Sequence, residues 1–400
     1  MQKSTKRIPH ILFLDVNITN SIGGGQYFAS RLISALNSKF HFTIASGLYT
    51  FYLQEQIKNC NVLLPGKLIM LLALILQHIY ALKNRKVIIL LASGFFLVYI
   101  YLFSREIKRS NELYDLVLTG DGYYQGEVIT LISKLKREPI IHMLLSSEPL
   151  DLTGVPFFRL LSIKLLRFVA HSRNLFFIAL NKYVAEDFLK VFPQHVIQIG
   201  AGVETDKYSP VEFDSKQNII LYVGRLDEGQ KNISLLIKAF ANLRNTSYSL
   251  LIVGDGKDRE FYLDMINKFD IAEKCKLMGF VSEREKIGLL SKSKIFVNPS
   301  TREGQSSAVL EAMSSGCAVI CVDNNGARDT IINGLNGTII DNDVNSLKMA
   351  LENLILNEGK IKELSSNARN WVLKNYSISI IAQKYQRLFN NIMGENCETI

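Results

Sequence analysis

The sequence predicts an α/β protein of two domains, each built around a parallel β-sheet. The chain has 400 residues, which is too long for one hydrophobic core of ordinary size. Short apolar runs alternate with segments of helical spacing in both halves, a rhythm typical of strand–helix–strand units. Residues 200–210 are rich in turn formers, which indicates a linker between the two domains.

Composition narrows the classes of function. Hydrophobic residues make up 48% and charged residues 21%, a balance typical of a globular protein. The net charge of +9 suits nucleic acid, an anionic membrane surface or a substrate that carries phosphate. We expect no nucleic acid partner, because the sequence has no RNA-binding motif, no zinc ligand set and no alternation of aromatic and basic residues. The five cysteines show no paired spacing, which indicates a reducing compartment.

The N-terminal half opens like a doubly wound domain. The apolar run at 8–16 contains Pro9, His10 and Asp15, so we interpret it as a first strand rather than a signal peptide. Further strands are expected at 40–45, 60–64, 115–119, 138–144 and 175–180, the last one of this half. His142 lies near the carboxyl end of its strand, where α/β sheets bind ligands. A packed or hydrogen-bonded histidine is the alternative.

A glycine loop follows the first strand. Gly23, Gly24 and Gly25 precede a helix expected over 27–36, and they allow a backbone to approach a ligand closely. Their spacing is not G-x-G-x-x-G, so a dinucleotide fingerprint is not supported. A tight turn without a ligand is the alternative.

Residues 68–103 form an unusually apolar tract. A helix over 87–103 would be about 25 Å long, short of the roughly 30 Å hydrocarbon core of a bilayer. A spanning hairpin would also place the basic residues 83–86 on the far side, against the positive-inside bias. We therefore expect helices embedded in, or lying on, one leaflet. A buried core segment is the alternative, and a pass through the bilayer is a third.

Three turns of the C-terminal half follow expected strands. Arg225 and Lys231 lie between the strand 219–223 and a helix over 233–243, which predicts a phosphate cradle. Two solvated surface cations are the alternative. The other two turns follow strands at 250–253 and 276–278, and they contain these residues: Gly254, Asp255 and Gly256, then Gly279, Phe280 and Val281.

The stretch 300–313 carries two acids around a strand-to-helix turn. It follows an apolar strand at 294–299, and Gly316 is expected to end its helix. Glu303 and Glu311 lie on either side of the turn, where backbone N–H groups at a helix start can bind an anion. This pattern predicts a site for a phosphorylated sugar. The only Asp-x-Asp, at 341–343, is interpreted as a turn into a helix from Leu347.

The motifs in this order resemble the retaining, nucleotide-sugar-dependent family 4 glycosyltransferases of GT-B fold. The likeness covers nearly the whole chain and is strongest over 200–322. It implies two Rossmann-like domains facing a cleft: 1–200 for the acceptor, 201–375 for the nucleotide sugar, and a helix within 376–400 returning to the first domain. Ser379 is expected to cap that helix.

The resemblance also implies roles for single residues. Arg225 and Lys231 would hold the donor diphosphate in place of a metal. Glu303 would bind hydroxyls of the donor sugar, and Glu311 would bind the ribose diol. His142 matches a histidine near the transferred sugar. Other donor-binding positions would be Gly23, Gly24, Gly25, Gly224, Gly254, Gly256, Phe280, Val281, Ser306, Ser307 and Ala308. Gln305 departs from the family pattern, which often has an aromatic residue there, and this changes the expected shape of the sugar pocket.

The function implied is transfer of a sugar from a nucleotide diphosphate to a hydroxyl, without a metal or other cofactor. A UDP-sugar is favoured over a GDP-sugar. The apolar tract suggests a lipid-linked acceptor in polysaccharide or glycolipid assembly, with the protein at the cytoplasmic face of an anionic membrane. A transferase acting on a small soluble acceptor is one alternative. A non-catalytic, membrane-bound scaffold subunit is another.

Overall fold

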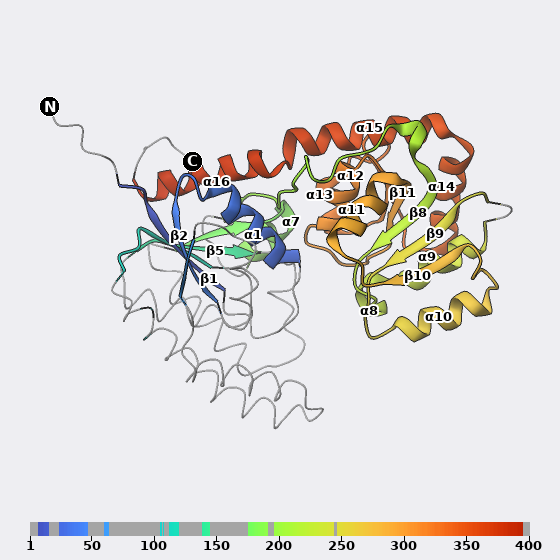
Figure 1. Ribbon diagram of the computed structural model, residues 1–400, viewed down its shortest axis with the longest axis horizontal. Helices are drawn as coiled ribbons and strands as arrows, with labels where there is room; N and C mark the ends of the chain where they lie inside the picture. Colours follow the sequence, from blue (N-terminus) through green and yellow to red (C-terminus); the bar gives the residue numbers. More distant parts are fainter. Residues whose placement is uncertain are drawn as a thin grey trace, which may run out of the picture. The chain divides into compact units, whose positions relative to one another are not determined.

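The protein consists of two compact units. The structure, a computed structural model, describes residues 7–15, 24–46, 60–63, 105, 107, 112–119, 138–144, 175–190, 196–243 and 246–394. Unit 1 comprises Met1–Ile199 together with Ala382–Ile400, and unit 2 comprises Gly200–Ile381. Figure 1 shows an α/β arrangement in each unit.

Unit 1 is built on a seven-stranded sheet in the order β3-β2-β1-β4-β5-β6-β7, and each of its neighbouring strands pairs in parallel. The strands are β1 (His10–Asp15), β2 (His41–Ser46), β3 (Asn61–Leu63), β4 (Leu116–Thr119), β5 (Ile140–Leu144), β6 (Leu175–Ala179) and β7 (Val196–Gln198). β1 is flanked by β2 and β4 and is buried from Ile11 to Leu14. Such apolar strands are typical of parallel sheets covered on both faces.

Three helices whose bounds lie in the described ranges belong wholly or partly to unit 1. They are α1 (Gly24–Leu36), α7 (Lys182–Leu189) and α16 (Ile378–Ile392). In α16, the ring of Tyr385 lies 6.2 Å from that of Phe28, and the ring of Phe389 lies 5.5 Å from that of Phe40. The final turns of α16 are therefore part of the aromatic core of unit 1.

The expected strands of the N-terminal half are confirmed. Three other expectations for unit 1 are corrected, one about its last strand and two about where helices begin. β6 is not the last strand, because β7 follows it with three partly exposed residues that give no apolar run. The first helix begins at Gly24 rather than at residue 27, so Gly24 and Gly25 lie in its first turn. The hydroxyl of Ser377, rather than Ser379, accepts the backbone N–H of Ile380 at the start of α16. Gly23 and the tract 68–103 lie outside the described residues.

Unit 2 contains a six-stranded parallel sheet in the order β10-β9-β8-β11-β12-β13. Its strands are β8 (Gln217–Val223), β9 (Ser249–Val253), β10 (Cys275–Gly279), β11 (Ser293–Asn298), β12 (Ala318–Val322) and β13 (Thr338–Ile340). The expected strands are all confirmed. β12 is buried at every residue, so it reads in the sequence as the continuous apolar run of a strand covered on both faces.

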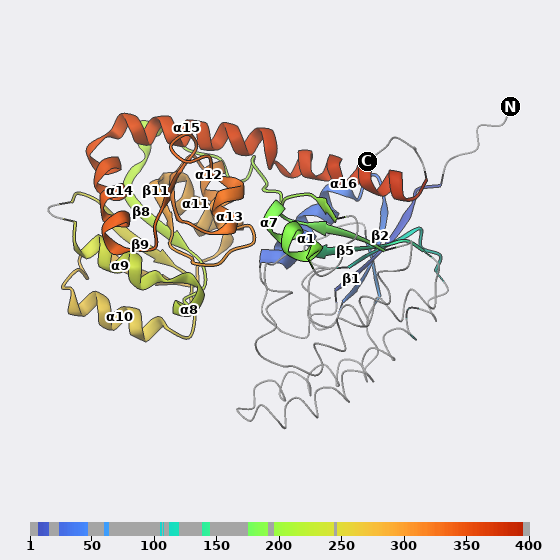
Figure 2. The same cartoon turned by 180° about the vertical axis from the view of Figure 1, so that it is seen from behind.

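The helices of unit 2 cover both faces of this sheet (Figure 2). They are α8 (Glu228–Lys231), α9 (Ile233–Ala241), α10 (Arg259–Lys268), α11 (Glu283–Lys292), α12 (Ser307–Ser314), α13 (Asn325–Thr330), α14 (Val344–Leu356) and α15 (Glu358–Asn375), with the short 3-10 helix η1 (Phe213–Ser215). α14 packs against α9, whereas α15 packs against α12 and β12. As expected, α12 ends before Gly316, whose φ of +66° suits a glycine.

The strand order of unit 2 places a topological switch point between β8 and β11. The chain runs from β8 outward to β9 and β10, and then returns to β11 on the other side of β8. Ligands of open α/β sheets bind at the carboxyl ends of the strands at such a point. The loop after β8 carries Arg225 and the loop after β11 carries Glu303, so the sheet brings these two segments to one edge.

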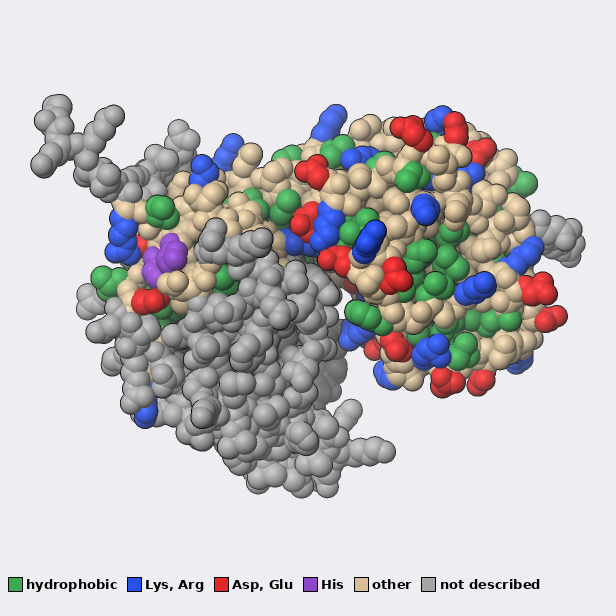
Figure 3. Space-filling model, in the orientation of Figure 1, with side chains coloured by type: hydrophobic (Ala, Val, Ile, Leu, Met, Phe, Trp, Pro, Cys, Tyr) green, Lys and Arg blue, Asp and Glu red, His purple; other side chains and the backbone are tan. Residues whose placement is uncertain are grey.

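Two observations on the described residues concern contact with a membrane. No helix in the described ranges is both long and apolar enough to cross a bilayer. Figure 3 shows basic and acidic side chains interspersed over the visible face of unit 2.

Candidate active site

Arg225 sits on a short, well-fixed turn after β8. The hydroxyl of Tyr222 donates to the carbonyl of Arg225 at 3.0 Å, beneath the exposed guanidinium. Burial, and next the carboxylate of Glu303, raise the pKa of the Tyr222 hydroxyl, so this hydroxyl remains a donor. Asp227 then caps α8 by accepting from the backbone N–H of Gly229. The turn therefore leaves the guanidinium exposed while its backbone is held.

Lys231 and Glu303 form the central ion pair of the site. The Nζ of Lys231 lies 2.5 Å from the Oε1 of Glu303, although the two residues are 72 positions apart in the sequence. Their side chains are only 16% and 12% exposed. Lys231 ends α8, a four-residue helix that no apolar periodicity could reveal. The structure thus brings one predicted cation and the first predicted acid into direct contact.

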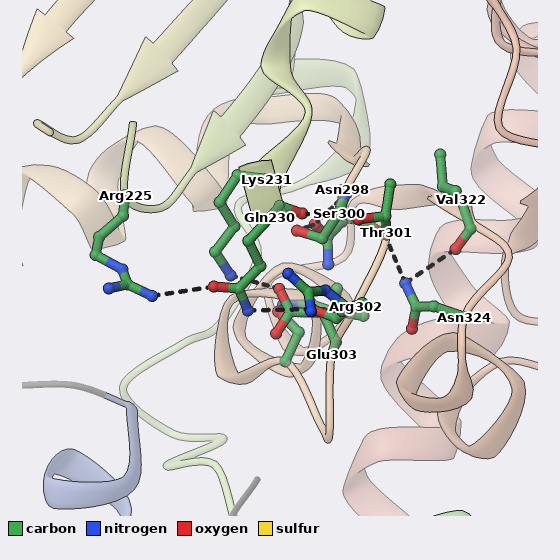
Figure 4. A network of polar contacts seen from close by, with 12 residues as sticks. Arg225, Gln230, Lys231, Asn298, Ser300, Thr301, Arg302, Glu303, Val322 and Asn324 are labelled. Carbon is green, nitrogen blue, oxygen red and sulfur yellow. Dashed lines mark hydrogen bonds and ion pairs between the residues drawn. The ribbon is translucent and has the colours of Figure 1, made fainter. Parts of the chain in front are cut away.

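Gln230 joins Arg225 to the acid-bearing loop (Figure 4). Its Oε1 accepts from the guanidinium of Arg225 at 3.1 Å, and its Nε2 donates to the carbonyl of Arg302 at 3.1 Å. Its backbone carbonyl accepts from the backbone N–H of Thr301 at 3.0 Å. Sequence reasoning missed this residue, and its position next to Lys231 was the only signal available.

The loop 300–306 is also held by the segment after β12. The side-chain amide of Asn324 donates to the carbonyl of Ser300 at 2.8 Å, and its oxygen caps α13. The backbone N–H of Gly326 donates to the carbonyl of Glu303 at 3.1 Å. A Cβ at Gly326 would lie 2.8 Å from the carbonyl oxygen of Gly304, so only glycine fits there. The loop carrying Glu303 is therefore fixed from both sides.

Gln305 turns away from the loop surface. It is 9% exposed, and its Oε1 accepts from the backbone N–H of Ala201 at 2.5 Å. The expectation that this residue shapes the sugar pocket therefore stays a prediction, with the side chain placed against the first residues of unit 2.

Glu311 lies in α12 and pairs with a different cation. Its side chain is 5% exposed, and its Oε2 lies 3.0 Å from the Nζ of Lys286 in α11. Ser306 caps α12 through a bond from the backbone N–H of Val309, so Ser307 and Ala308 form the first turn. First-turn N–H groups have no acceptor within their own helix, as an anion site requires.

The predicted glycines lie where three turns interlock. A Cβ at Gly254 would lie 1.9 Å from the carbonyl oxygen of Gly224, and one at Gly256 would lie 2.3 Å from that of Leu226. At Gly224, a Cβ would lie 2.5 Å from the hydroxyl of Tyr222. The close approach of these turns to one another and to Tyr222 is therefore enough to require glycine at the three positions. A contact with a ligand stays a prediction.

Phe280 and Val281 follow the carboxyl end of β10. The side chain of Phe280 is 85% exposed, whereas Val281 is partly buried. A large aromatic ring left this exposed on a strand-end turn is available to stack on a planar group.

His142 lies in the middle of β5, not near its end. It is 6% exposed, its Nδ1 lies 3.0 Å from the Oγ1 of Thr119, and its ring lies 5.9 Å from that of Phe177. Burial lowers the pKa of its imidazole to about 4. These surroundings favour the alternative of a hydrogen-bonded interior histidine, so we give it no part in the proposed mechanism.

The buried imidazole gives a prediction about acid stability. Because the folded pKa is about 4 and the ordinary value is 6.5, the unfolded chain binds the proton more tightly. The stabilising contribution of the neutral imidazole is therefore fully present above pH 6.5, and it is lost as the pH falls towards 4. Near pH 5 the free energy of unfolding of unit 1 should be lower by about 2 kcal/mol than at neutral pH.

The measurement compares wild type with His142→Asn. Thermal unfolding followed by circular dichroism at pH 7 and pH 5 should show a smaller acid effect in the variant. Trp371, the single tryptophan, lies in unit 2, so its fluorescence serves as an internal control that should not respond to the substitution. An equal loss of thermal stability at pH 5 in both proteins would contradict the prediction that the buried imidazole of His142 causes it.

Metal and thiol chemistry leave few candidates in the described ranges. No group of three or more His, Cys, Asp or Glu side chains there could hold a metal ion. Asp343 of the Asp-x-Asp caps α14 by accepting from the backbone N–H groups of Asn345 and Ser346, as the predicted turn requires. Cys60, Cys275, Cys317 and Cys321 are free thiols.

Two domains with parallel sheets, and charged residues at the switch point of the second sheet, are features of the GT-B fold of glycosyltransferases. A solved structure of Anabaena HepE in complex with UDP shares this fold with a TM-score of 0.74, at 16% identity over 96% of this chain and 100% of that one. Residues 204–371 match the family described as glycosyl transferases group 1. The GT-B fold and the likeness to this family of glycosyltransferases, both inferred from the motifs, are thereby confirmed.

Two curated relatives are similar to part of this chain. A Campylobacter jejuni N-acetylgalactosamine-N,N'-diacetylbacillosaminyl-diphospho-undecaprenol 4-alpha-N-acetylgalactosaminyltransferase is 34% identical over 154 residues, 38% of this chain and 41% of its own length. The capsular polysaccharide biosynthesis glycosyltransferase CapM of Staphylococcus aureus is 26% identical over 181 residues, 44% of this chain and 47% of its own. The matches thus span less than half of either relative.

Proposed function

We propose that the protein is a retaining glycosyltransferase that moves a sugar from a nucleotide diphosphate to a hydroxyl acceptor without a metal ion. The observation that carries this proposal is the ion pair of Lys231 with Glu303 beside Arg225, at the switch point of unit 2. Two cations and a carboxylate at that edge suit a diphosphate joined to a sugar.

Each charged group has a task in the transfer. Arg225 and Lys231 stabilise the negative charge that develops on the departing diphosphate. Glu303, already held by Lys231, accepts hydrogen bonds from hydroxyls of the donor sugar. Glu311 accepts from the ribose hydroxyls, and Phe280 stacks on the base.

The reaction proceeds on one face of the sugar. The bond between the anomeric carbon and the diphosphate oxygen breaks, and the acceptor oxygen bonds to the same face of that carbon. The acceptor proton passes to the departing phosphate oxygen. No separate base is then needed, and the configuration at the anomeric carbon is retained.

The acceptor proposed is a lipid-linked sugar at the inner face of the membrane, in polysaccharide or glycolipid assembly. The name of the Campylobacter relative contains a diphospho-undecaprenol acceptor, and CapM is a capsular polysaccharide enzyme. The apolar tract 68–103 supports contact with an anionic membrane surface. The free thiols support a cytoplasmic location. A UDP-sugar is proposed as donor because the HepE structure holds UDP.

A donor screen tests this function. UDP- and GDP-sugars are incubated with the protein in the presence of a chelator. The acceptor added is a membrane lipid extract, a small soluble sugar or none, and release of the nucleoside diphosphate is measured. We expect one UDP-sugar to give release that depends on the lipid extract, with a product whose anomeric configuration matches the donor. Release with a small soluble acceptor alone would contradict the lipid-linked acceptor. No release above that of Arg225→Ala with any donor would contradict the enzyme assignment.

A further inference from the structure

Lys286 and Glu311 form an ion pair between two helices beside the proposed donor site. The Nζ of Lys286 in α11 lies 3.0 Å from the Oε2 of Glu311 in α12. The carboxylate side chain is 5% exposed, whereas the lysine side chain is 22% exposed. The lysine is thus the more exposed partner of the pair.

The lysine ammonium is held from a second direction by an aromatic ring. Its Nζ lies 5.2 Å from the ring centroid of Tyr208, which is fully buried. The hydroxyl of Tyr208 donates to Glu283 at 3.3 Å, at the start of the same helix α11. The ammonium therefore has two neighbours, an aromatic ring and a carboxylate, that hold it in place.

A carboxylate as buried as that of Glu311 is costly unless a cation compensates it. The ammonium of Lys286 at 3.0 Å supplies that cation, and a lysine has three donors, of which Glu311 takes one.

On this basis, and resting on the proposed function, we propose that Lys286 is a positioning residue for nucleotide binding. It holds the Glu311 carboxylate oriented towards the ribose hydroxyls, and it makes binding depend on a ribonucleoside rather than a deoxyribonucleoside diphosphate. A simple brace between α11 and α12 is the rival role. The two roles differ because a brace would not distinguish one sugar of the nucleotide from another.

The chain offers a matched control for this lysine. Lys294 also pairs with a glutamate, Glu358, at 2.5 Å, and its Nζ also lies over an aromatic ring, that of Phe213, at 5.8 Å. Lys294→Met therefore removes the same kind of contact at a place that carries none of the proposed donor-binding residues.

The test measures equilibrium binding of UDP and of 2',3'-dideoxy-UDP by calorimetry to wild type, Lys286→Met, Lys286→Arg and Lys294→Met. We expect Lys286→Met to weaken UDP binding about tenfold and to leave the dideoxy nucleotide unchanged. Lys286→Arg should restore most of the UDP affinity, and Lys294→Met should change neither affinity. The Trp371 fluorescence of unit 2 reports whether each variant is folded, and Lys286→Gln replaces Lys286→Met if that variant is not.

Two results would overturn the proposal. Equal weakening of both nucleotides by Lys286→Met would show a brace, and unchanged UDP affinity would show no role. Both leave the proposed function standing, because wild type still binds the nucleotide. A wild-type protein that binds neither UDP nor GDP would instead remove the proposed function, and this inference with it.

Discussion

Glutamine in place of Glu303 is expected to lower donor turnover by about a hundredfold or more. The substitution keeps the shape of the side chain but removes the charge that strengthens its hydrogen bonds to the sugar hydroxyls. It also leaves the ammonium of Lys231, only 16% exposed, without the carboxylate that lies 2.5 Å away. Turnover is measured as release of the nucleoside diphosphate from the donor identified in the screen.

The control for this prediction is Glu358→Gln. Glu358 pairs with Lys294 at the same 2.5 Å, but its side chain is 64% exposed and lies outside the proposed site. Turnover in that variant should match wild type. Arg225→Ala should cause a loss as large as that of Glu303→Gln, through the leaving diphosphate rather than the sugar. Normal turnover in both Glu303→Gln and Arg225→Ala, with both folded, would remove the assignment of the site.

Alanine in place of Gly254 is expected to destabilise unit 2 by about 3 kcal/mol or more. Gly254 has a φ of +134°, a conformation that side chains rarely adopt. The added Cβ would also lie 1.9 Å from the backbone oxygen of Gly224, which cannot move without shifting the turn that carries Arg225. The free energy of unfolding is measured by urea denaturation followed by Trp371 fluorescence, which reports unit 2 alone.

Two other glycines separate the causes of that loss. Gly279 has a φ of +70° but open space around a Cβ, so Gly279→Ala should cost only about 1 kcal/mol of backbone strain. Gly288 lies within α11, also with open space, so Gly288→Ala should stabilise unit 2 by about 0.5–1 kcal/mol. Equal effects of Gly254→Ala and Gly279→Ala would show that the close approach to Gly224 is not what requires glycine.

Much of the fold could be predicted because buried parallel strands are apolar runs. β11 and β12 are buried almost throughout, and each stands out in the sequence as such a run. β7, β13 and α8 were missed because they have only three or four residues, too few to show a period. The start of α16 was misplaced by two residues because Ser377 and Ser379 are equally good capping residues by sequence.

The site was predicted less completely than the fold. Arg225, Lys231, Glu303 and Glu311 each follow a strand, so their gathering at one sheet edge could be inferred. Which charges pair could not be inferred, because each acid has its lysine on another element. Lys286 and Gln230 look like ordinary surface residues in the sequence, and only the packing of neighbouring helices and loops gives them partners.

The pairing of Lys231 with Glu303 also says when the site can form during folding. The two residues lie on loops after β8 and β11, strands that become neighbours only after the chain has passed through β9 and β10. Closing a loop of this length costs entropy that local turns do not, so such a contact forms slowly. A nascent chain therefore has no assembled site until residues beyond β11 have left the ribosome. Shortened products that end before that strand then lack the assembled site, although they contain both cations.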